Sequence, residues 1–291
     1  MRPGRPVTRR PRLVALDVDG CLLQWTPGTV KAEERVRPAV RQAVRRVVAA
    51  GVPVVLASGR SGLGLADVAG LLGLPSAGTG RLWFVASNGA VLCRHPPLEV
   101  VRATTFDASD AVAAVLRRLP DARLAVEDAR SGYRVTADFP RGELSGRVAR
   151  VRPEELGAHE ATRVIVRRPE RHDPGGLDAL AAELGRAGVA GTGYVVGLTD
   201  WLDLSPAGVT KASGLATVAE ELGVARAEVL AIGDGANDIE MLTWAGRGVA
   251  MGQADAEVRA AADATTLPVD EDGVAAELDR WFGPDPTAGR G

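Results

Sequence analysis

The chain has 291 residues, 46% of them hydrophobic, so it can bury a full core and is long enough for one large or two modest domains. Its formal net charge of −2 gives no general reason to expect a nucleic-acid or membrane partner, and its longest nearly apolar stretch, residues 47–57, is too short to cross a bilayer. The two cysteines form no disulfide framework or zinc-ribbon spacing, and we expect reduced thiols and a cytoplasmic protein.

The chain begins with a short basic segment. Residues 1–12 contain five arginines and three prolines. This composition predicts a solvated, disordered leader, with an RNA-binding or anionic-surface arm as the less favoured alternative.

Strands and helices then alternate. Residues 13–16 are continuously apolar and predict a first strand. Apolar residues spaced for one helix face predict a helix that ends at Gly51, and residues 52–57 predict a strand buried on both faces. A helix over residues 63–72 and a third strand over residues 82–86 follow. This order predicts an α/β fold with a doubly wound, Rossmann-like parallel sheet.

The pattern changes in the middle of the chain. Between residues 90 and 205, short alternating strands and two helical stretches are typical of a separate α+β domain. From Thr210 the first pattern resumes, with helices and strands in alternation. We therefore predict a core of residues 13–89 and 206–282, an inserted cap of residues 90–205, and a disordered tail of residues 283–291.

Acidic residues follow two of the predicted strands. Asp17 and Asp19 come after the first strand, and Asp234 and Asp238 come after the strand over residues 229–233. Ligands of open parallel sheets bind at the carboxyl ends of the strands. Four acids gathered there would repel one another without a cation, and a site of oxygen ligands suits magnesium better than zinc or copper. The sequence therefore predicts a metal-dependent site.

Five sequence strings occur in order along the chain: LVALDVDGCLL, VVLASGR, SNGA, GVTKASGLATVAEELGV and IGDGANDIEMLTWAGRGVAMGQADAEV. Together with the cap-sized insertion, they make the chain resemble the haloacid dehalogenase (HAD) superfamily of phosphohydrolases, in particular its Cof-like branch. The resemblance spans residues 13–277. It implies a Rossmann-like core, an inserted α+β cap and phosphate-ester chemistry.

The resemblance implies a role for each acidic residue. Asp17 would attack phosphorus and form an aspartyl-phosphate. Asp19, which starts on the same side of an extended segment, would act as general acid and then general base. The Asp17 carboxylate, the backbone carbonyl of Asp19 and the Asp234 carboxylate would hold Mg²⁺, with Asp238 in support.

The resemblance also implies a phosphate-binding set. Ser58 and Lys211 would bind the phosphoryl oxygens, and Asn237 and the backbone near Gly59 would add contacts. Arg60 is a weaker candidate for a phosphate or cap contact. Outside this family frame, a serine after a strand is more often a turn residue and a lysine that opens a helix is more often solvated.

Two other groups are assigned structural roles. Residues 87–89 are interpreted first as a turn and cap hinge, and only second as a substrate contact. The aromatic residues of the inserted segment, namely Tyr133, Phe139, Tyr194 and Trp201, are interpreted as cap core in preference to a specificity pocket.

The chain departs from the family pattern at two positions. Cys21 stands where threonine usually follows Asp-Gly, and Gln253 stands where asparagine is common. Cysteine is close to threonine in size but is a weaker hydrogen-bond donor. One hypothesis is that oxidation of Cys21 inhibits the enzyme, and the favoured alternative is that Cys21 is a buried, inert substitution.

These observations together predict a magnesium-dependent phosphomonoester hydrolase that acts on a small phosphorylated metabolite. The resemblance to the Cof-like branch makes a sugar phosphate the leading substrate class, and nucleotide and flavin phosphates remain open. A phosphomutase that uses the same aspartyl-phosphate and a noncatalytic phosphometabolite-binding regulator are the alternatives. We expect no nucleic-acid or membrane partner, and a monomer or homodimer.

Overall fold

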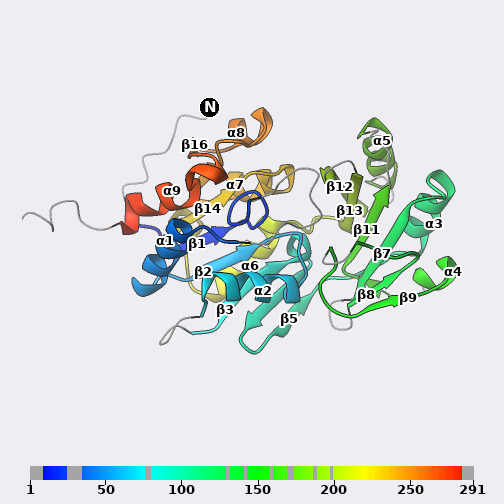
Figure 1. Ribbon diagram of the computed structural model, residues 1–291, viewed down its shortest axis with the longest axis horizontal. Coiled ribbons are helices and arrows are strands. Elements are labelled where there is room, and N and C mark those ends of the chain that lie inside the picture. Colours follow the sequence, from blue (N-terminus) through cyan, green and yellow to red (C-terminus); the bar gives the residue numbers. More distant parts are fainter. Residues whose placement is uncertain are drawn as a thin grey trace, which may run out of the picture.

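The computed structural model describes residues 9–24, 35–75, 80–128, 132–140, 143–157, 160–168, 174–185, 189–196 and 199–283. Two large sheets and one two-stranded pair organise these residues, and Figure 1 shows helices on both sides of the largest sheet. The smaller of the two large sheets lies beside it with its helices on the side away from the core. No helix among the residues listed above combines the length and apolarity that a membrane span requires.

The larger sheet has eight strands in the order β16-β15-β14-β1-β2-β3-β4-β5. All neighbours from β16 to β3 are parallel, and β4 and β5 continue the sheet as antiparallel strands. The strand bounds are β1 Leu13–Leu16, β2 Val54–Ala57, β3 Leu82–Ala86, β4 Val91–His95, β5 Glu99–Ala103, β14 Val229–Gly233, β15 Arg247–Ala250 and β16 Ala264–Thr265.

Helices cover both faces of this sheet. Val14 and Leu16 of β1 pack toward α1 (Pro38–Ala49), α2 (Gly62–Leu72) and α9 (Gly273–Phe282). The alternate residues Leu13 and Ala15 pack toward the other three helices, which are α6 (Lys211–Glu221), α7 (Ile239–Trp244) and α8 (Ala256–Ala261). A strand that is buried on both faces reads as a continuous apolar run. The prediction of a doubly wound α/β sheet is confirmed.

The inserted segment forms a six-stranded sheet in the order β12-β13-β11-β7-β8-β9, and a two-stranded pair of β6 with β10. Helices α3, α4 and α5 accompany it. The bounds are β6 Phe106–Asp107, α3 Ser109–Arg118, β7 Arg123–Asp128, β8 Gly132–Val135, β9 Val148–Arg150, α4 Pro153–Leu156, β10 Glu160–Ala161, β11 Arg163–Arg168, α5 Pro174–Gly185, β12 Val189–Val196 and β13 Thr199–Pro206.

The structure differs from the expected start of the insertion at residue 90. Strands β4 and β5 pair with β3 and with each other, so residues 91–103 belong to the core sheet. Their short alternating pattern resembles that of the inserted strands, and this similarity is why the sequence grouped them with the cap. The sheet places the start of the inserted unit after Ala103.

The structure also differs from the expected disordered leader. Pro11 is buried, and the Arg12 backbone N–H donates to the Glu228 carbonyl at 2.9 Å. The Arg10 guanidinium lies 4.4 Å from the ring centroid of Phe282 in α9. The last residues of the basic segment are therefore packed on the core, whereas residues 1–8 lie outside the described part of the chain, as do residues 284–291 of the expected tail.

Candidate active site

The candidate site lies at the carboxyl edge of the core sheet. Asp17 follows β1, Ser58 follows β2, Ser87 follows β3, and Asp234 follows β14. These four strands are parallel neighbours, so their carboxyl ends meet along one edge. Sequence positions more than two hundred residues apart are thereby brought to one place.

Lys211 is the centre of a buried ion network. Its Nζ donates hydrogen bonds of 2.7 Å to Asp17 Oδ1 and of 2.7 Å to Asp238 Oδ1. The Lys211 side chain is only 1% exposed. Helix α6 positions it, because the Thr210 side chain accepts from the Ser213 backbone N–H and fixes the start of the helix. The lysine that opens the helix is therefore a buried partner of the acids and not a solvated side chain.

Asp238 organises the loop after β14. Its second oxygen, Oδ2, accepts hydrogen bonds of 3.0 Å from the backbone N–H groups of Asp234 and Gly235. The side chain therefore joins the loop that carries Asp234 to Lys211. Asp238 is fully buried, and the supporting role expected for it stays a prediction.

The electrostatics of the network show an excess of negative charge. Burial first, and then Asp238, raise the pKa of Asp17 well above its ordinary value, although Lys211 opposes this. Burial and Asp238 raise the pKa of Asp234 to about 6. Burial would lower the pKa of Lys211, but Asp17 and Asp238 together raise it above its ordinary value. Three carboxyls thus share one lysine, an imbalance that a divalent cation would correct.

The donor set fits such a cation. Ligand atoms of Asp17, Cys21 and Asp234 lie within 4.8 Å of one another. Gly20 makes this approach possible: its φ is +84°, and a Cβ there would lie 2.0 Å from Asp234 Oδ2. Two carboxylates beside a backbone turn suit a hard divalent ion that prefers oxygen ligands.

The two positions that depart from the family pattern both touch Asp234. Cys21 Sγ lies 3.7 Å from Asp234 Oδ1 as a weak donor. Gln253 Nε2 donates to Asp234 Oδ2 at 3.2 Å and to the Gly20 carbonyl at 2.7 Å. The longer amide side chain therefore still ties Asp234 to the loop after β1.

Asp19 is separated from the lysine network and pairs with Arg60. The guanidinium donates from Nε at 2.9 Å and from Nη2 at 2.6 Å to the two carboxylate oxygens. The Asp19 side chain is 47% exposed, whereas that of Arg60 is 17% exposed. Arg60 is only a weak candidate from the sequence, and its guanidinium pairs with an acid of the site.

The remaining phosphate-binding candidates lie on the neighbouring loops. Ser58 is buried, and its Oγ accepts from the Arg60 backbone N–H at 3.1 Å. Asn237 donates from Nδ2 to Asn88 Oδ1 at 3.0 Å. Ser87 and Asn88 have left-handed backbone conformations with φ of 50° and 54°, which are uncommon for residues other than glycine. The turn expected at residues 87–89 thus contacts the candidate site.

Comparison with known proteins agrees with this geometry. A family model described as haloacid dehalogenase-like hydrolase matches residues 14–278. The chain belongs to this family. A phosphoglycolate phosphatase of Natronomonas pharaonis is 34% identical over 267 residues, which cover 92% of this chain and 96% of that protein.

Solved structures show the same HAD fold. A HAD-superfamily phosphatase from Bacteroides thetaiotaomicron is 26% identical, with a TM-score of 0.72 over 96% of this chain and 98% of that one. A sugar phosphatase of HAD subclass IIB has a TM-score of 0.74 at 21% identity, over 93% of this chain and 98% of that one. The family and these relatives support phosphatase activity for this HAD hydrolase.

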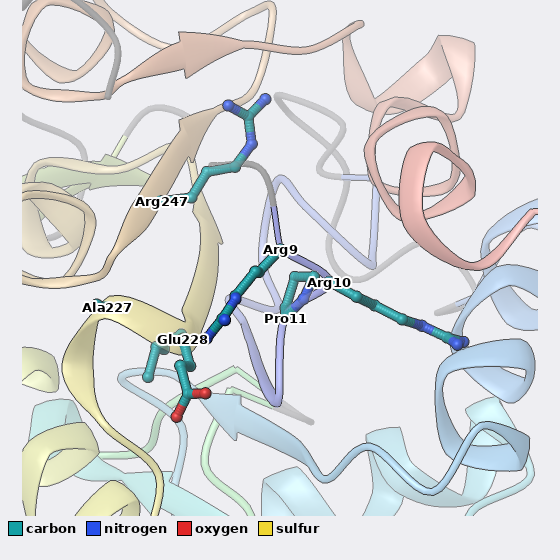
Figure 2. Close-up of a pocket in the computed structure, with 7 residues that line it drawn as sticks. Arg9, Arg10, Pro11, Ala227, Glu228 and Arg247 are labelled. Carbon is teal, nitrogen blue, oxygen red and sulfur yellow. The ribbon is translucent and has the colours of Figure 1, made fainter. Parts of the chain in front are cut away.

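A cavity of this HAD hydrolase lies away from the candidate site. It has a volume of about 150 Å³ and is lined by Arg9, Arg10, Pro11, Ala227, Glu228, Val229 and Arg247. Figure 2 shows the Arg9 side chain pointing toward Glu228, which precedes β14, and Arg247, the first residue of β15, farther away. These two residues lie at the amino ends of the strands, so this cavity lies at the opposite edge of the sheet from the carboxylates.

Several residues near the site were not predicted from the sequence to reach it, and Tyr133 among them was interpreted only as cap core. Arg163, Glu127, Tyr133 and Asp203 of the inserted segment form a buried hydrogen-bonded cluster that reaches Gly59 and Asn88 of the core. They come from four different strands. Only the strand alternation, which turns charged residues to a buried face, could have indicated them.

Proposed function

We propose that this HAD hydrolase is a magnesium-dependent phosphomonoesterase that acts through Asp17 on a small phosphorylated metabolite. The observation that carries the proposal is the buried arrangement of Asp17, Lys211 and Asp238, with the two hydrogen bonds of Lys211 at 2.7 Å. The high pKa of Asp17 and of Asp234 supports a site that is completed by a cation. Asp17, the Asp19 carbonyl and Asp234 would hold Mg²⁺, with Asp238 in support.

The proposed reaction has two displacements at phosphorus. The Asp17 carboxylate forms a bond to phosphorus as the bond to the leaving oxygen breaks, and Asp19 gives that oxygen a proton. A water molecule then attacks the aspartyl-phosphate, Asp19 takes its proton, and the bond to Asp17 breaks to release phosphate. Bound Mg²⁺ supplies positive charge that reduces repulsion between the anionic nucleophile and the anionic substrate.

Lys211 and Ser58 support this reaction by position. The Lys211 ammonium lies against the nucleophile and opposes the rise in the pKa of Asp17 that burial causes. The same charge attracts the phosphoryl oxygens. Ser58 lies at the end of the adjacent strand, and its hydroxyl would donate a hydrogen bond to those oxygens, with Gly59 and Asn237 as neighbours on the same edge.

Asp19 must change partners during the proposed cycle. Both of its oxygens accept hydrogen bonds from Arg60. Protonating a leaving group therefore requires at least one of these bonds to break. We infer that the substrate draws the Arg60 guanidinium toward its own anionic groups, since arginine pairs well with phosphate.

The substrate is proposed to be a sugar phosphate or a similarly small phosphorylated metabolite. The inserted domain contacts the core beside the phosphate-binding loop, so a large phosphoprotein would have little access. Relatives named for activity on phosphoglycolate and on sugar phosphates support a small substrate.

The test is phosphate release from a panel of sugar phosphates, phosphoglycolate and nucleotides, with Mg²⁺ or with EDTA. Asp17→Asn should abolish release, by at least about a thousandfold, because an amide cannot replace the nucleophile. Asp121→Asn, at an exposed position, is the matched control and should retain full activity. A regioisomeric phosphosugar without free phosphate would indicate a mutase, and folded wild type without turnover would indicate a binding protein.

A further inference from the structure

Arg163 of β11 connects the inserted domain to the candidate phosphate-binding loop of the core. Its side chain is 6% exposed, and the residues around it come from both domains. Strand alternation explains its position: Val164 and Val166 pack toward the helices of the inserted domain, and Arg163 points to the opposite face. The helix-free face of this sheet therefore presents a cation to the core.

Partners within the inserted domain hold the guanidinium of Arg163 in place. Nε donates to Glu127 Oε2 at 3.0 Å, and Nη2 donates to the Tyr133 hydroxyl at 2.9 Å. The Tyr133 hydroxyl donates in turn to Glu127 Oε1 at 3.2 Å. Glu127 is 3% exposed and Tyr133 is 4% exposed. The planar guanidinium is thus oriented before it meets the core.

The third nitrogen of Arg163 reaches the core. Nη1 donates to the backbone carbonyl of Gly59, and also to Asp203 Oδ2 at 3.3 Å. The same Asp203 oxygen accepts from Asn88 Nδ2 at 3.2 Å. Gly59 lies tightly in this contact, because a Cβ there would lie 3.3 Å from Asn88 Oδ1 and 3.4 Å from Asp203 Oδ2.

The loop of residues 58–60 is held from two sides. Its first and third carbonyls accept backbone hydrogen bonds within the core: Ser58 from the Asn88 N–H at 3.0 Å, and Arg60 from the Ser87 N–H at 2.9 Å. The middle carbonyl, that of Gly59, accepts from Arg163 of the inserted domain. The core and the inserted domain thus each fix part of one three-residue loop.

We propose that Arg163 is a positioning residue, which completes the phosphate-binding loop only when the inserted domain is seated on the core. This inference rests on the proposed function, because the loop carries Ser58 and the arginine that pairs with Asp19. Fixing the Gly59 carbonyl fixes the neighbouring peptide planes and hence the direction of both groups. Phosphoryl binding is thereby coupled to seating of the inserted domain, whatever the leaving group.

The variants that test this are Arg163→Met, which keeps length without hydrogen bonds, and Arg163→Lys, which keeps charge without the planar fork. The matched control is Arg167→Met, on the same strand and face, where Arg167 pairs with Glu143 of the inserted domain at 3.3 Å. Each variant is compared with wild type in the presence of Mg²⁺. The readouts are inhibition by orthovanadate, which resembles a phosphoryl group without a leaving group, and KM for two substrates with different leaving groups.

We expect both Arg163 variants to bind vanadate at least about tenfold more weakly and to raise KM by a similar factor for both substrates, while Arg167→Met stays within about twofold of wild type. A role in domain stability alone would lower the unfolding temperature of Arg163→Met and Arg167→Met alike and leave vanadate inhibition unchanged, which would overturn the inference. A KM change for only one substrate would also overturn it.

Two further results separate this inference from the proposed function. Wild type that neither hydrolyses a substrate nor binds vanadate would overturn both. Active wild type with unaltered vanadate binding in Arg163→Lys and Arg163→Met would overturn the positioning role alone. Should Arg163→Met fail to fold, Arg163→Lys and Asp203→Asn carry the test, since the first keeps the buried positive charge and the second keeps the size of the Asp203 side chain. Vanadate inhibition unchanged in both variants would overturn the positioning role.

Discussion

The core and the inserted domain each bury a cation among carboxylates, but the two networks differ in what completes them. In the core, Lys211 binds two carboxylates at 2.7 Å, and Asp234 adds a third carboxyl nearby. The pKa of Asp17 and that of Asp234 are both raised, first by burial and then by Asp238. This network contains more negative charge than its lysine balances.

In the inserted domain, Arg163 donates to two carboxylates and also to two neutral groups. These are the Tyr133 hydroxyl and the Gly59 carbonyl. Burial first, and then Glu127, raise the pKa of Tyr133, so the hydroxyl stays protonated and donates to Glu127. The core network therefore carries an excess of negative charge, as the proposed cation site requires, whereas the more nearly balanced network of Arg163 joins the inserted domain to the core.

The largest expected effect comes from removing the cation of the core network. Lys211→Met leaves Asp17 and Asp238 buried without the group to which both are hydrogen-bonded. We expect the free energy of unfolding to fall by about 3 kcal/mol or more at neutral pH. Phosphate release should fall by at least about a thousandfold, because the nucleophile loses its positive neighbour. Denaturant unfolding and phosphate release measure the two effects.

The matched control is a buried ion pair at the other edge of the core sheet. Arg247 donates to the buried Glu277 at 2.7 Å and 3.1 Å, near the cavity of Figure 2. Arg247→Met should lower the free energy of unfolding by about 2 kcal/mol but leave kcat/KM within about twofold of wild type. Equal losses of activity in both variants would show that the core network has no special role.

A second prediction concerns the excess charge of the core network and its dependence on pH. The pKa of Asp234 is raised from 3.8 to about 6 in the folded protein. A carboxyl with a raised folded pKa stabilises the fold at pH below its unfolded pKa, and this contribution is lost as the pH rises through the folded pKa. Wild type in EDTA should therefore lose stability relative to Asp234→Asn between about pH 4 and pH 7, by about 2 kcal/mol.

The measurement is chemical denaturation of both proteins in EDTA across this range. Asp255→Asn, at an exposed position at the start of α8, serves as the control and should follow wild type at every pH. If the free energies of unfolding of wild type and Asp234→Asn changed in parallel with pH, the excess of negative charge would be contradicted. At pH 7, saturating Mg²⁺ should make wild type more stable than Asp234→Asn, since a ligand that binds only the folded state stabilises it.

The same difference between the networks explains what the sequence could predict. Asp17, Asp234 and Asp238 follow strands whose apolar runs are clear, and the parallel order brings strand ends to one edge, so the core fold and the gathering of its acids follow from the chain itself. Lys211 was indicated only by the family resemblance, because a lysine at a helix start is usually solvated. Their separate catalytic roles stay predictions.

The hydrogen-bonded network around Arg163 in the inserted domain could not be predicted in this way. Arg163 and Asp203 are 40 residues apart and Arg163 and Gly59 are 104 apart, so no local spacing joins them. Their meeting depends on strand order within the insertion and on the contact between two domains. Strands β4 and β5 were assigned to the wrong unit for a similar reason, since alternation predicts a strand but does not name its sheet.

The smallest expected effect is at Cys21, which touches the core network without carrying its charge. The thiol is 1% exposed, and burial first, and then Asp234 and Asp17, raise its pKa well above the ordinary value. Because the thiolate is the reactive form, we expect peroxide to leave the activity of wild type unchanged, in opposition to the oxidation hypothesis. Cys21→Thr should change kcat/KM by no more than about threefold, since the sulfur is only a weak donor to Asp234 at 3.7 Å. Phosphate-release assays before and after peroxide treatment, on wild type and on Cys21→Thr, decide the question. Loss of activity in wild type alone would show that Cys21 is redox-sensitive. The negative charge beside the thiol would then not be enough to prevent its oxidation.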